Sequence, residues 1–398
     1  MKVAIIADDL TGAADTGVQF AAAGYRTVVA FLEAPVPSER DIEVVAVDTD
    51  SRALPPDSAA KRVLEVASAI KDTRVAYKKI DSTLRGPVAA ELVAALKGTG
   101  RNRAVVAPAF PSAGRTTKEG VQLVGGVPVH ETDMKNDPRT PVREGHFPTL
   151  LAQSASSIAT LSAGELTDHV GVRRALEGAS YVVADAESDS DLEALVRAVP
   201  DPSKVLWVGS AGLAFAFGKV YPGPHAGEPP PVPAPVGRVL VVVGSLTGIA
   251  REQLRRFVRE FGGAASVNTG GPDAVEEAVD TVRIALSGGA RAAVYSDEEG
   301  DFSEDSKSAV EALAEVVASV EGEGLFDALI LTGGDTAVEV AQRLGATGIR
   351  LEGEIEPGIP FGTLVGPSPY PVVTKAGGFG EPDTLARVVE TLLQGEKG

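Results

Sequence analysis

Short apolar runs recur along the chain, each about as long as a β-strand, with helical stretches between them. They are VAIIA (3–7), TVVAF (27–31), EVVAVDT (43–49), RVAYKKI (74–80), AVVAPAF (104–110), YVVADA (181–186), KVLWVG (204–209), VLVVVG (239–244), AAVYSD (292–297) and ALILTGG (328–334). Val, Ile, Leu and Ala fill successive positions instead of alternating with polar residues, which is typical of parallel strands buried on both faces. The pattern predicts an α/β fold with mainly parallel sheets flanked by helices.

One segment interrupts this pattern. Residues 221–237 read YPGPHAGEPPPVPAPVG and favour neither a helix nor a central strand, so we expect an extended, polyproline-like spacer. A new buried strand, RVLVVVGS, follows at once. The chain of 398 residues is also longer than one core usually serves. We therefore predict two domains, residues 1–221 and 238–398, each with its own sheet and joined by a Pro-rich linker at 222–237.

Charge and cysteine content narrow the classes of function. The formal net charge of -18 argues against a broad nucleic-acid surface, which needs an extended basic face. The absence of cysteine excludes disulfides and thiolate metal sites, and favours a cytoplasmic protein. The short N-terminal apolar run is followed by two aspartates, which suits neither a signal peptide nor a membrane span. An anionic ligand must therefore meet a local cluster of positive charge.

Such a cluster occurs in the segment KKIDSTLRGPVAAEL, which follows a predicted strand. Pro87 is expected at the first helical position, which places Arg85 beside free N–H groups and the positive end of the helix dipole. Lys78, Lys79 and Arg85 are then expected to hold an anion. Asp81 should stay ionised among these cations and accept a proton or a hydroxyl hydrogen bond. A merely solvated loop is the alternative.

The first strand is followed by two adjacent aspartates, Asp8 and Asp9, at the start of a predicted helix. A helix cap and turn would explain one such residue. Together with Asp15, however, the pair exceeds what a cap needs. These carboxylates could accept hydrogen bonds from substrate hydroxyls or hold a cation.

Arginine follows two other strands. Arg52 suits bidentate capture of a carboxylate or phosphate, and a surface ion pair with Asp48 or Asp50 is the alternative. The loop PAFPSAGRTTK adds Arg115 and Lys118 among small residues, as expected of a ligand-facing segment. For the next irregular loop, HETDMKNDPRTPVREG, a structural role and a substrate lid are both open.

The C-terminal part offers glycine-rich turns after its strands. Three combine glycine with hydroxyls or a lysine: Gly244-Ser245-Leu246-Thr247-Gly248, Gly333-Gly334-Asp335-Thr336, and Lys375 with Gly377-Gly378-Phe379-Gly380. Glycine lets the backbone approach a phosphate closely, and a hydroxyl at a helix start adds a donor. Three such turns indicate a site for the phosphate chain of a nucleotide. Neither a Walker P-loop nor a Rossmann fingerprint is present, so the site is of another kind.

Two hydrolase classes are disfavoured. The four histidines, at positions 130, 146, 169 and 225, lack the H-E-x-x-H spacing of zinc hydrolases. Ser210 lies in WVGSAGLA, which is not a G-x-S-x-G elbow and has no recognisable histidine partner.

The sequence resembles the four-carbon acid sugar kinases, a family of threonate, erythronate and oxo-tetronate kinases. The resemblance is carried by IADDLTGAADTG, KKIDSTLRG, PAFPSAGRTT, DPRTPV, WVGSAGLA, VVVGSLT, LTGGDTA and TKAGGFG, in the family's order and over nearly the whole chain. The family's turn after the first C-terminal strand often reads Ser-Cys-Ser. Here it is Ser245-Leu246-Thr247, which keeps the hydroxyls but leaves their individual roles open.

The resemblance implies an ATP-dependent kinase with an N-terminal acid-sugar domain and a C-terminal nucleotide domain. It implies substrate contacts at Asp9, Arg52, Lys79, Ile80, Asp81 and Ser82, to which the helix-start argument adds Arg85. It implies nucleotide contacts at Ser245, at Gly333 to Thr336 and around Gly378, to which the turn argument adds Thr247, Lys375, Gly377, Phe379 and Gly380.

Phosphoryl transfer depends mainly on positioning and charge neutralisation. We expect Arg52 and Lys79 to hold the substrate carboxylate, while Asp9 and Asp81 orient its hydroxyls. One of the two aspartates, with Asp81 favoured, would be the catalytic base. Mg²⁺ is expected to bridge ATP oxygens, helped by Asp335 as a metal ligand.

Two rival functions are open. A non-catalytic sensor of sugar phosphates and nucleotides would carry the same turns and basic cluster. A sugar-phosphate isomerase or aldolase would need no ATP. The expected partners are a small acid sugar and ATP, without nucleic acid or membrane. The identity of the acid, the hydroxyl phosphorylated and formation of a homo-oligomer are open.

Overall fold

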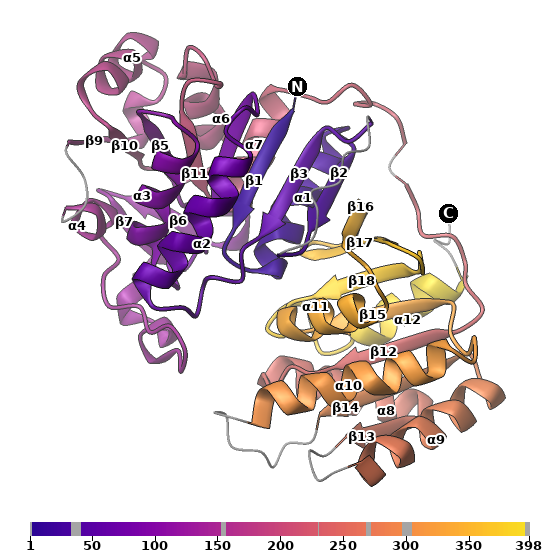
Figure 1. Ribbon diagram of the computed structural model, residues 1–398. Coiled ribbons are helices and arrows are strands. Elements are labelled where there is room, and N and C mark those ends of the chain that lie inside the picture. Colours follow the sequence, from indigo (N-terminus) through magenta and orange to yellow (C-terminus); the bar gives the residue numbers. More distant parts are fainter. Residues whose placement is uncertain are drawn as a thin grey trace. The chain divides into compact units, whose positions relative to one another are not determined.

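The computed structural model describes residues 2–32, 41–152, 157–229, 231–267, 272–296 and 305–394. The chain divides into two units, Met1–Glu228 and Pro229–Gly398 (Figure 1). The division lies inside the segment 222–237 for which a linker is predicted, and Pro230 of that segment is outside the described residues. The linker therefore stays a prediction.

The N-terminal unit contains a sheet in the order β2-β3-β1-β4-β11-β5-β10-β9, in which every neighbouring pair is parallel. Its strands are β1 Val3–Ala7, β2 Thr27–Ala30, β3 Val44–Asp48, β4 Val75–Lys79, β5 Ala104–Ala107, β9 Ile158–Leu161, β10 Tyr181–Ala184 and β11 Leu206–Gly209. A small antiparallel sheet adds β6 Arg115–Lys118, β7 Val121–Val124 and β8 Val127–Pro128.

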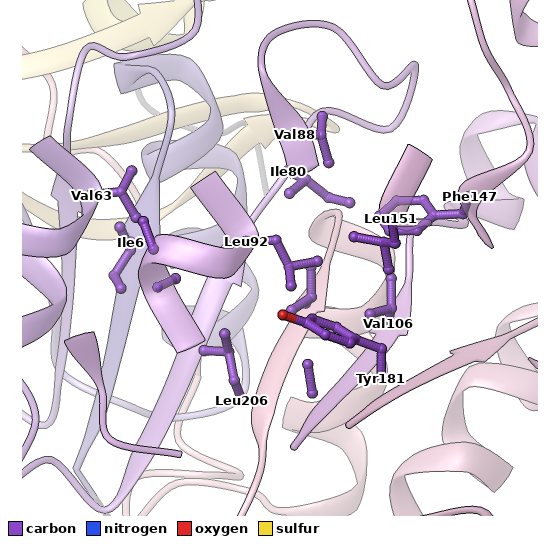
Figure 2. Packing of buried hydrophobic residues seen from close by; sticks show 14 of the residues in the cluster. Ile6, Val63, Ile80, Val88, Leu92, Val106, Phe147, Leu151, Tyr181 and Leu206 are labelled. Carbon is purple, nitrogen blue, oxygen red and sulfur yellow. The ribbon is translucent and has the colours of Figure 1, made fainter. Parts of the chain in front are cut away.

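Helices cover both faces of the N-terminal sheet. They are α1 Leu10–Ala22, α2 Pro56–Ala69, α3 Val88–Gly98, α4 Phe147–Leu151, α5 His169–Gly178, α6 Asp189–Ala198 and α7 Ala211–Val220, with short 3₁₀ turns at Pro111–Ala113, Val129–Glu131, Asp133–Asn136 and Ala163–Glu165. The core on one face joins Ile6 and Val106 of the sheet to Val63 of α2 and Leu92 of α3 (Figure 2). On the other face, Phe20 of α1 and Phe217 of α7 pack with Tyr77 and Trp207 of the sheet.

The C-terminal unit has a sheet in the order β13-β14-β12-β15-β18-β17-β16. Its elements are β12 Val239–Val243, α8 Gly248–Phe261, β13 Ala264–Val267, α9 Pro272–Gly288, β14 Arg291–Ser296, α10 Asp305–Glu321, β15 Ala328–Thr332, α11 Gly334–Arg343, β16 Gly348–Glu356, β17 Ile359–Val365, β18 Pro371–Lys375 and α12 Thr384–Gln394. The first five strands are parallel, and β16 and β17 continue the sheet in antiparallel fashion.

The predicted α/β fold is confirmed, because each unit has a mainly parallel sheet flanked by helices. All ten apolar runs contain a strand, although the last residue of the 292–297 run is outside the described residues. The ten runs do not include the strands β9, β13, β16, β17 and β18 or the three strands of the small sheet. Glu352, Glu354 and Glu356 of β16 alternate with smaller or apolar residues, so this strand carries no continuous apolar run.

None of the helices in the described ranges is long and apolar enough to cross a membrane.

Candidate active site

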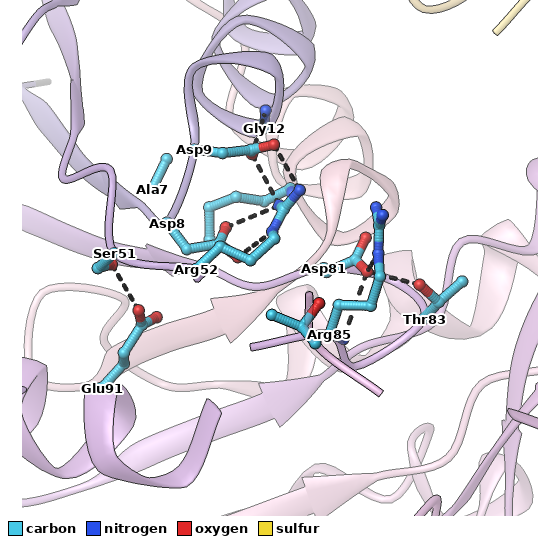
Figure 3. Close-up of polar contacts among 12 residues, drawn as sticks. Ala7, Asp8, Asp9, Gly12, Ser51, Arg52, Asp81, Thr83, Arg85 and Glu91 are labelled. Atoms are coloured by element: carbon cyan, nitrogen blue, oxygen red, sulfur yellow. Dashed lines mark hydrogen bonds and ion pairs between the residues drawn. The ribbon is translucent and has the colours of Figure 1, made fainter. Parts of the chain in front are cut away.

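The sheet order brings three polar strand ends together in the N-terminal unit. Strand β1 lies between β3 and β4, and both pairs are parallel, so the loops that follow these strands leave the same edge of the sheet. The loops carry Asp8 and Asp9, Arg52, and the segment from Lys79 to Arg85. We refer to Asp8, Asp9, Arg52, Lys79, Asp81 and Arg85 as the charged cluster. Figure 3 labels all of these residues except Lys79.

Arg52 is held by the two aspartates that follow β1. Its Nε donates to Asp8 Oδ2 at 2.7 Å, its Nη2 donates to Asp9 Oδ1 at 2.7 Å, and Nη1 also donates to Asp9. Neither Asp48 nor Asp50 is the ion-pair partner of Arg52; Asp50 pairs with Arg62 instead. Four N–H groups of the guanidinium contact the two carboxylates, so Arg52 mainly fixes their positions.

Asp9 caps a helix in addition to pairing with Arg52. It is the N-cap of α1 and accepts a hydrogen bond from Gly12 N at 2.7 Å, as the cap alternative predicts. Burial raises the pKa of Asp9 and the charge of Asp8 adds to this, although Arg52 and Lys79 oppose it. Burial also acts on the Asp8 carboxyl, but the charges of Arg52, Lys78 and Lys79 outweigh it and hold the pKa of Asp8 below its usual value.

The two lysines at the end of β4 point to opposite faces of the sheet, as neighbours in a strand must. Lys78 is fully buried and pairs with Glu91 of α3 at 2.9 Å. Glu91 also accepts a hydrogen bond from Ser51, which ties the loop after β3 to α3. Lys78 therefore does not join Lys79 and Arg85 in holding an anion, and that expectation is wrong. The strand alternation is the physical reason.

Lys79 turns toward α1. A Cβ atom at Gly12 would stand 2.8 Å from Lys79 Nζ, so the ammonium group lies against the helix where glycine leaves room. The side chain is only 4% exposed. Among the residues that the structure describes, its Nζ has no hydrogen bond and no ion pair. The carboxylates of Asp9, Asp15 and Asp81 act on Lys79 through their charge without bonding to it, so its N–H groups are available to a ligand.

Asp81 is already bound on several sides. Arg85 Nε donates to its Oδ2 at 2.6 Å and Thr83 Oγ1 donates to the same oxygen at 2.5 Å. Burial acts to raise the pKa of Asp81, but the charges of Arg85 and Arg52 prevail and hold it far below its usual value. Such a carboxylate stays ionised, as predicted, but is a weak base. Its assignment as catalytic base stays a prediction, and its surroundings favour an orienting role.

The remaining predicted substrate residues differ in exposure. Ile80 is 1% exposed, its side chain belongs to the apolar core, and its N–H donates to Gly209 O at 3.0 Å, so only its carbonyl is available to a ligand. Ser82 is half-buried, and its carbonyl accepts a hydrogen bond from Gln122 of β7 at 2.8 Å. Leu84 has a φ of 59°, a strained conformation that often marks functional loops. Pro87 is the N-cap of α3 and not its first residue, one position from the prediction.

A charged residue that was not predicted, Asp137, also supports this loop. Asp137 lies 3.7 Å from Arg85 Nη1, so the DPRTPV segment contacts the cluster through an ion pair. Arg115 begins β6, and its buried Nε has no acceptor in the described part of the chain. Glu91 was missed, although a lone acid in the apolar helix PVAAELVAAL is a usable signal for a buried ion pair.

Asp48 gives the N-terminal unit a pH-dependent stability. Its carboxyl is 3% exposed and accepts a hydrogen bond from Asp50 N at 2.8 Å. Burial raises its pKa from 3.8 to about 8, with Asp9, Asp50 and Asp8 adding to the effect. The unfolded chain therefore binds fewer protons than the folded chain between these values. The free energy of unfolding must fall as the pH rises through this window.

We expect Asp48→Asn to remove this loss, because asparagine keeps an acceptor oxygen without a charge. The gain should be on the order of 1–3 kcal/mol at pH 8 and close to zero at pH 4. Thermal unfolding at both pH values, with the exposed Asp72→Asn as control, measures it. If the melting temperatures of Asp48→Asn and the native protein differed by the same amount at both pH values, the account would be contradicted.

Three turns converge in the C-terminal unit, because β12, β15 and β18 are neighbouring parallel strands. A Cβ atom at Gly377 would stand 1.8 Å from Ser245 Oγ, and one at Gly244 would stand 2.0 Å from Thr336 Oγ1. The predicted turns after these strands therefore touch one another. We refer to residues 244–248, 333–336 and 375–380 as the glycine cradle.

Helix starts lie at two of these turns. Thr247 is the N-cap of α8, and its hydroxyl accepts a hydrogen bond from Ala250 N at 3.3 Å. Gly333 is the N-cap of α11 with a φ of 108°, which only glycine adopts readily. Free N–H groups at such helix starts are suited to phosphate oxygens.

The lysine and phenylalanine of the third turn differ in exposure. Lys375 Nζ donates to the carbonyls of Ala376 and Phe379, at 2.9 and 3.2 Å, and burial lowers its pKa to about 8. Lys375 therefore shapes the turn. Phe379 is 39% exposed, so its ring is accessible.

No group of three or more His, Asp or Glu side chains that could hold a metal occurs in the described ranges. Asp335 is an exposed carboxylate in the first turn of α11, beside Thr336. One carboxylate next to hydroxyls fits Mg²⁺ that is held mainly by nucleotide phosphates, because Mg²⁺ commonly binds proteins through one or two carboxylates.

The fold and these two sites define a class of protein: an α/β protein with a charged cluster in one unit and a glycine cradle in the other. Family models agree with this division. Residues 3–217 match the model described as a sugar-binding N-terminal domain, and residues 240–385 match a nucleotide-binding C-terminal domain. The chain belongs to the four-carbon acid sugar kinase family.

Curated relatives cover the chain almost completely. The chain is 38% identical to a D-threonate kinase of Bordetella bronchiseptica, over 98% of each chain. It is 31% identical to a D-erythronate kinase of Heliobacterium modesticaldum, over 98% of this chain and 97% of the relative. It is 28% identical to a 3-oxo-tetronate kinase of Methylobacterium radiotolerans, over 98% of this chain and 99% of the relative.

Solved structures share the fold. A protein of Salmonella typhimurium LT2 matches with a TM-score of 0.82 over 97% of this chain and 98% of its own, at 24% identity, which speaks for the fold alone. A domain of unknown function from B. bronchiseptica, crystallised as a domain-swapped dimer with bound citrate, matches with a TM-score of 0.51 at 36% identity, over 99% of each chain.

Proposed function

We propose that this protein is an ATP-dependent kinase that phosphorylates a hydroxyl of a four-carbon acid sugar in carbohydrate catabolism. The observation that carries the proposal is Lys79, a buried ammonium without a partner in the described chain, surrounded by carboxylates. A ligand that carries both a carboxylate and hydroxyls complements such a site. Relatives of 28–38% identity that are named as threonate, erythronate and oxo-tetronate kinases support the same substrate class.

In this proposal Lys79 binds the substrate carboxylate, and Arg52 assists with its remaining N–H group. Asp9 and Asp81 are held in place by arginines, and their free lone pairs accept hydrogen bonds from substrate hydroxyls. Ser82 and the carbonyl of Ile80 complete the contacts, and Arg85 positions Asp81. The B. bronchiseptica relative was crystallised with bound citrate, which is itself a hydroxy acid.

The glycine cradle is proposed to bind ATP. Backbone N–H groups at Gly334 and Gly377 and the hydroxyls of Ser245 and Thr336 would contact its phosphates, and Phe379 offers an exposed ring to the base. Asp335 would hold Mg²⁺, which supplies charge neutralisation on the phosphates.

The proposed partners are therefore an acid sugar, ATP and a second copy of the chain. The domain-swapped dimer formed by the B. bronchiseptica relative supports the homo-oligomer. The absence of cysteine supports the proposed cytoplasmic location.

Release of ADP tests this function. The purified protein is incubated with Mg-ATP and, separately, with D- and L-threonate, D- and L-erythronate and their 3-oxo relatives. We expect strong turnover with one member and only background hydrolysis without an acid. Binding of ATP without turnover on any acid would favour the sensor alternative. A nucleotide-induced rise in the melting temperature would count against an ATP-independent isomerase or aldolase.

A further inference from the structure

Asp15 lies on the face of α1 that carries Gly12, because the two positions are three residues apart in the helix. That face is turned toward the charged cluster: a Cβ atom at Gly12 would stand 2.6 Å from Asp9 Oδ1 and 2.8 Å from Lys79 Nζ. The Asp15 side chain is half-buried. Within the described part of the chain, its carboxylate accepts no hydrogen bond; only its backbone carbonyl does, from Gln19.

Charged groups from several elements act on this carboxylate. Lys79 of β4 and Arg115 of β6 attract it, while Asp9 and Asp81 repel it. Burial raises the pKa of Tyr77 of β4, and the charge of Asp15 adds to this. No ion pair joins Asp15 to either cation among the described residues. Lys79 has no partner there, and the buried Arg115 Nε has no acceptor. Asp15, Lys79 and Arg115 therefore lie near one another without forming ion pairs. Such an arrangement is suited to binding a polar ligand.

We propose that Asp15 is the catalytic base that takes the proton from the substrate hydroxyl, an inference that rests on the proposed kinase function. The hydroxyl oxygen forms a bond to the γ-phosphorus as its proton passes to the Asp15 carboxylate. The bond between the γ-phosphorus and the bridging oxygen breaks, and ADP leaves with the electron pair. Asp15 then releases the proton to solvent.

The other aspartates of the site are less suited to this step. Asp81 is bound by Arg85 and Thr83, and Asp9 is bound by Arg52 and caps α1. Burial raises the pKa of Asp15 to about 6, with Asp9 and Asp81 adding to this and Lys79 and Arg115 opposing it. A base whose pKa lies just below the working pH is ionised and still accepts a proton well.

The test compares the native protein with Asp15→Asn, using the acid that gives turnover. Asp72→Asn, an exposed aspartate after α2, is the matched control. We measure kcat and kcat/KM from pH 5 to 8, and the Kd of the acid by calorimetry. Asp15→Asn should lower kcat about 10²- to 10⁴-fold and change the Kd only a few-fold. In the native protein, kcat/KM should fall about tenfold per pH unit below about pH 6, which gives the pH profile an acidic limb. The residual kcat/KM of the variant should not show this fall.

A kcat within threefold of the native value in folded Asp15→Asn would overturn the inference, as would persistence of the acidic limb. If the variant does not fold, the native profile decides alone: a flat kcat/KM from pH 5 to 8 overturns the inference, and a limb near pH 6 supports it. Absence of native turnover on every acid would overturn the proposed function, and the inference with it. Native turnover with an unimpaired variant overturns the inference alone.

Discussion

Replacement of Lys79 by methionine is expected to lower kcat/KM for the acid sugar about a hundredfold to a thousandfold. Methionine keeps much of the apolar stem but removes the ammonium group, which lies in a buried site beside Asp9 and Gly12. Loss of one partner of a buried charge pair costs about 3–5 kcal/mol, because the other charge stays buried and uncompensated. The substrate carboxylate would be that uncompensated charge.

The measurement is steady-state kinetics with both substrates, combined with the binding of ATP alone. We expect the affinity for ATP to be unchanged, because the glycine cradle belongs to the other unit. Lys97→Met, at an exposed position in the last turn of α3, is the matched control and should retain native kinetics. A folded Lys79→Met protein with native kcat/KM would refute the assignment of Lys79 to the substrate.

Replacement of Gly377 by alanine is expected to raise the KM for ATP about tenfold to a hundredfold. The added Cβ atom would stand 1.8 Å from Ser245 Oγ and 2.7 Å from Ser245 Cβ. Rotation of the serine hydroxyl relieves the first contact but not the second, so the turns after β12 and β18 must move apart. Overpacking of this kind costs about 1–3 kcal/mol. The cost falls on the turns that are proposed to hold the phosphates.

Gly288→Ala is the control for this variant, because nothing lies within 4 Å of a Cβ atom at the end of α9. It should leave the kinetics unchanged. The binding of the acid sugar alone should also be unchanged in Gly377→Ala. A native KM for ATP in a folded Gly377→Ala protein would show that the cradle does not bind the nucleotide.

The fold could be predicted largely from the apolar runs, because strands buried on both faces cannot contain many polar residues. The runs of β1, β3 and β4 also indicate which loops leave the same edge of the sheet. Strands without a continuous apolar run were missed, including the short parallel strands β9, β13 and β18. The antiparallel β16 has alternating glutamates, and the strands of the small sheet are short and partly polar.

The candidate site could be located from sequence more readily than its internal pairing. The positions of Asp9, Arg52 and Lys79 at strand ends were enough to predict a common site. The separation of Lys78 from Lys79 depends on the register of β4 and on Glu91 of α3. That information lies in tertiary contacts, which local sequence does not contain.

The role proposed for Asp15 shows the same limit. A sequence can indicate that an aspartate follows a helix start, but not that its carboxylate is half-buried and, within the described ranges, without a hydrogen-bond donor. Basicity depends on burial and on the surrounding charges, which come from α1, β4 and β6 and from the loops after β1 and β4.

The most direct test of the central claim is ³¹P NMR of a reaction that contains the protein, Mg-ATP and the acid that releases ADP. The account predicts a new phosphomonoester signal whose integral equals that of ADP, with coupling to the proton on the phosphorylated carbon. Formation of ADP with an equal amount of inorganic phosphate, and no phosphomonoester, would contradict phosphoryl transfer to the acid sugar.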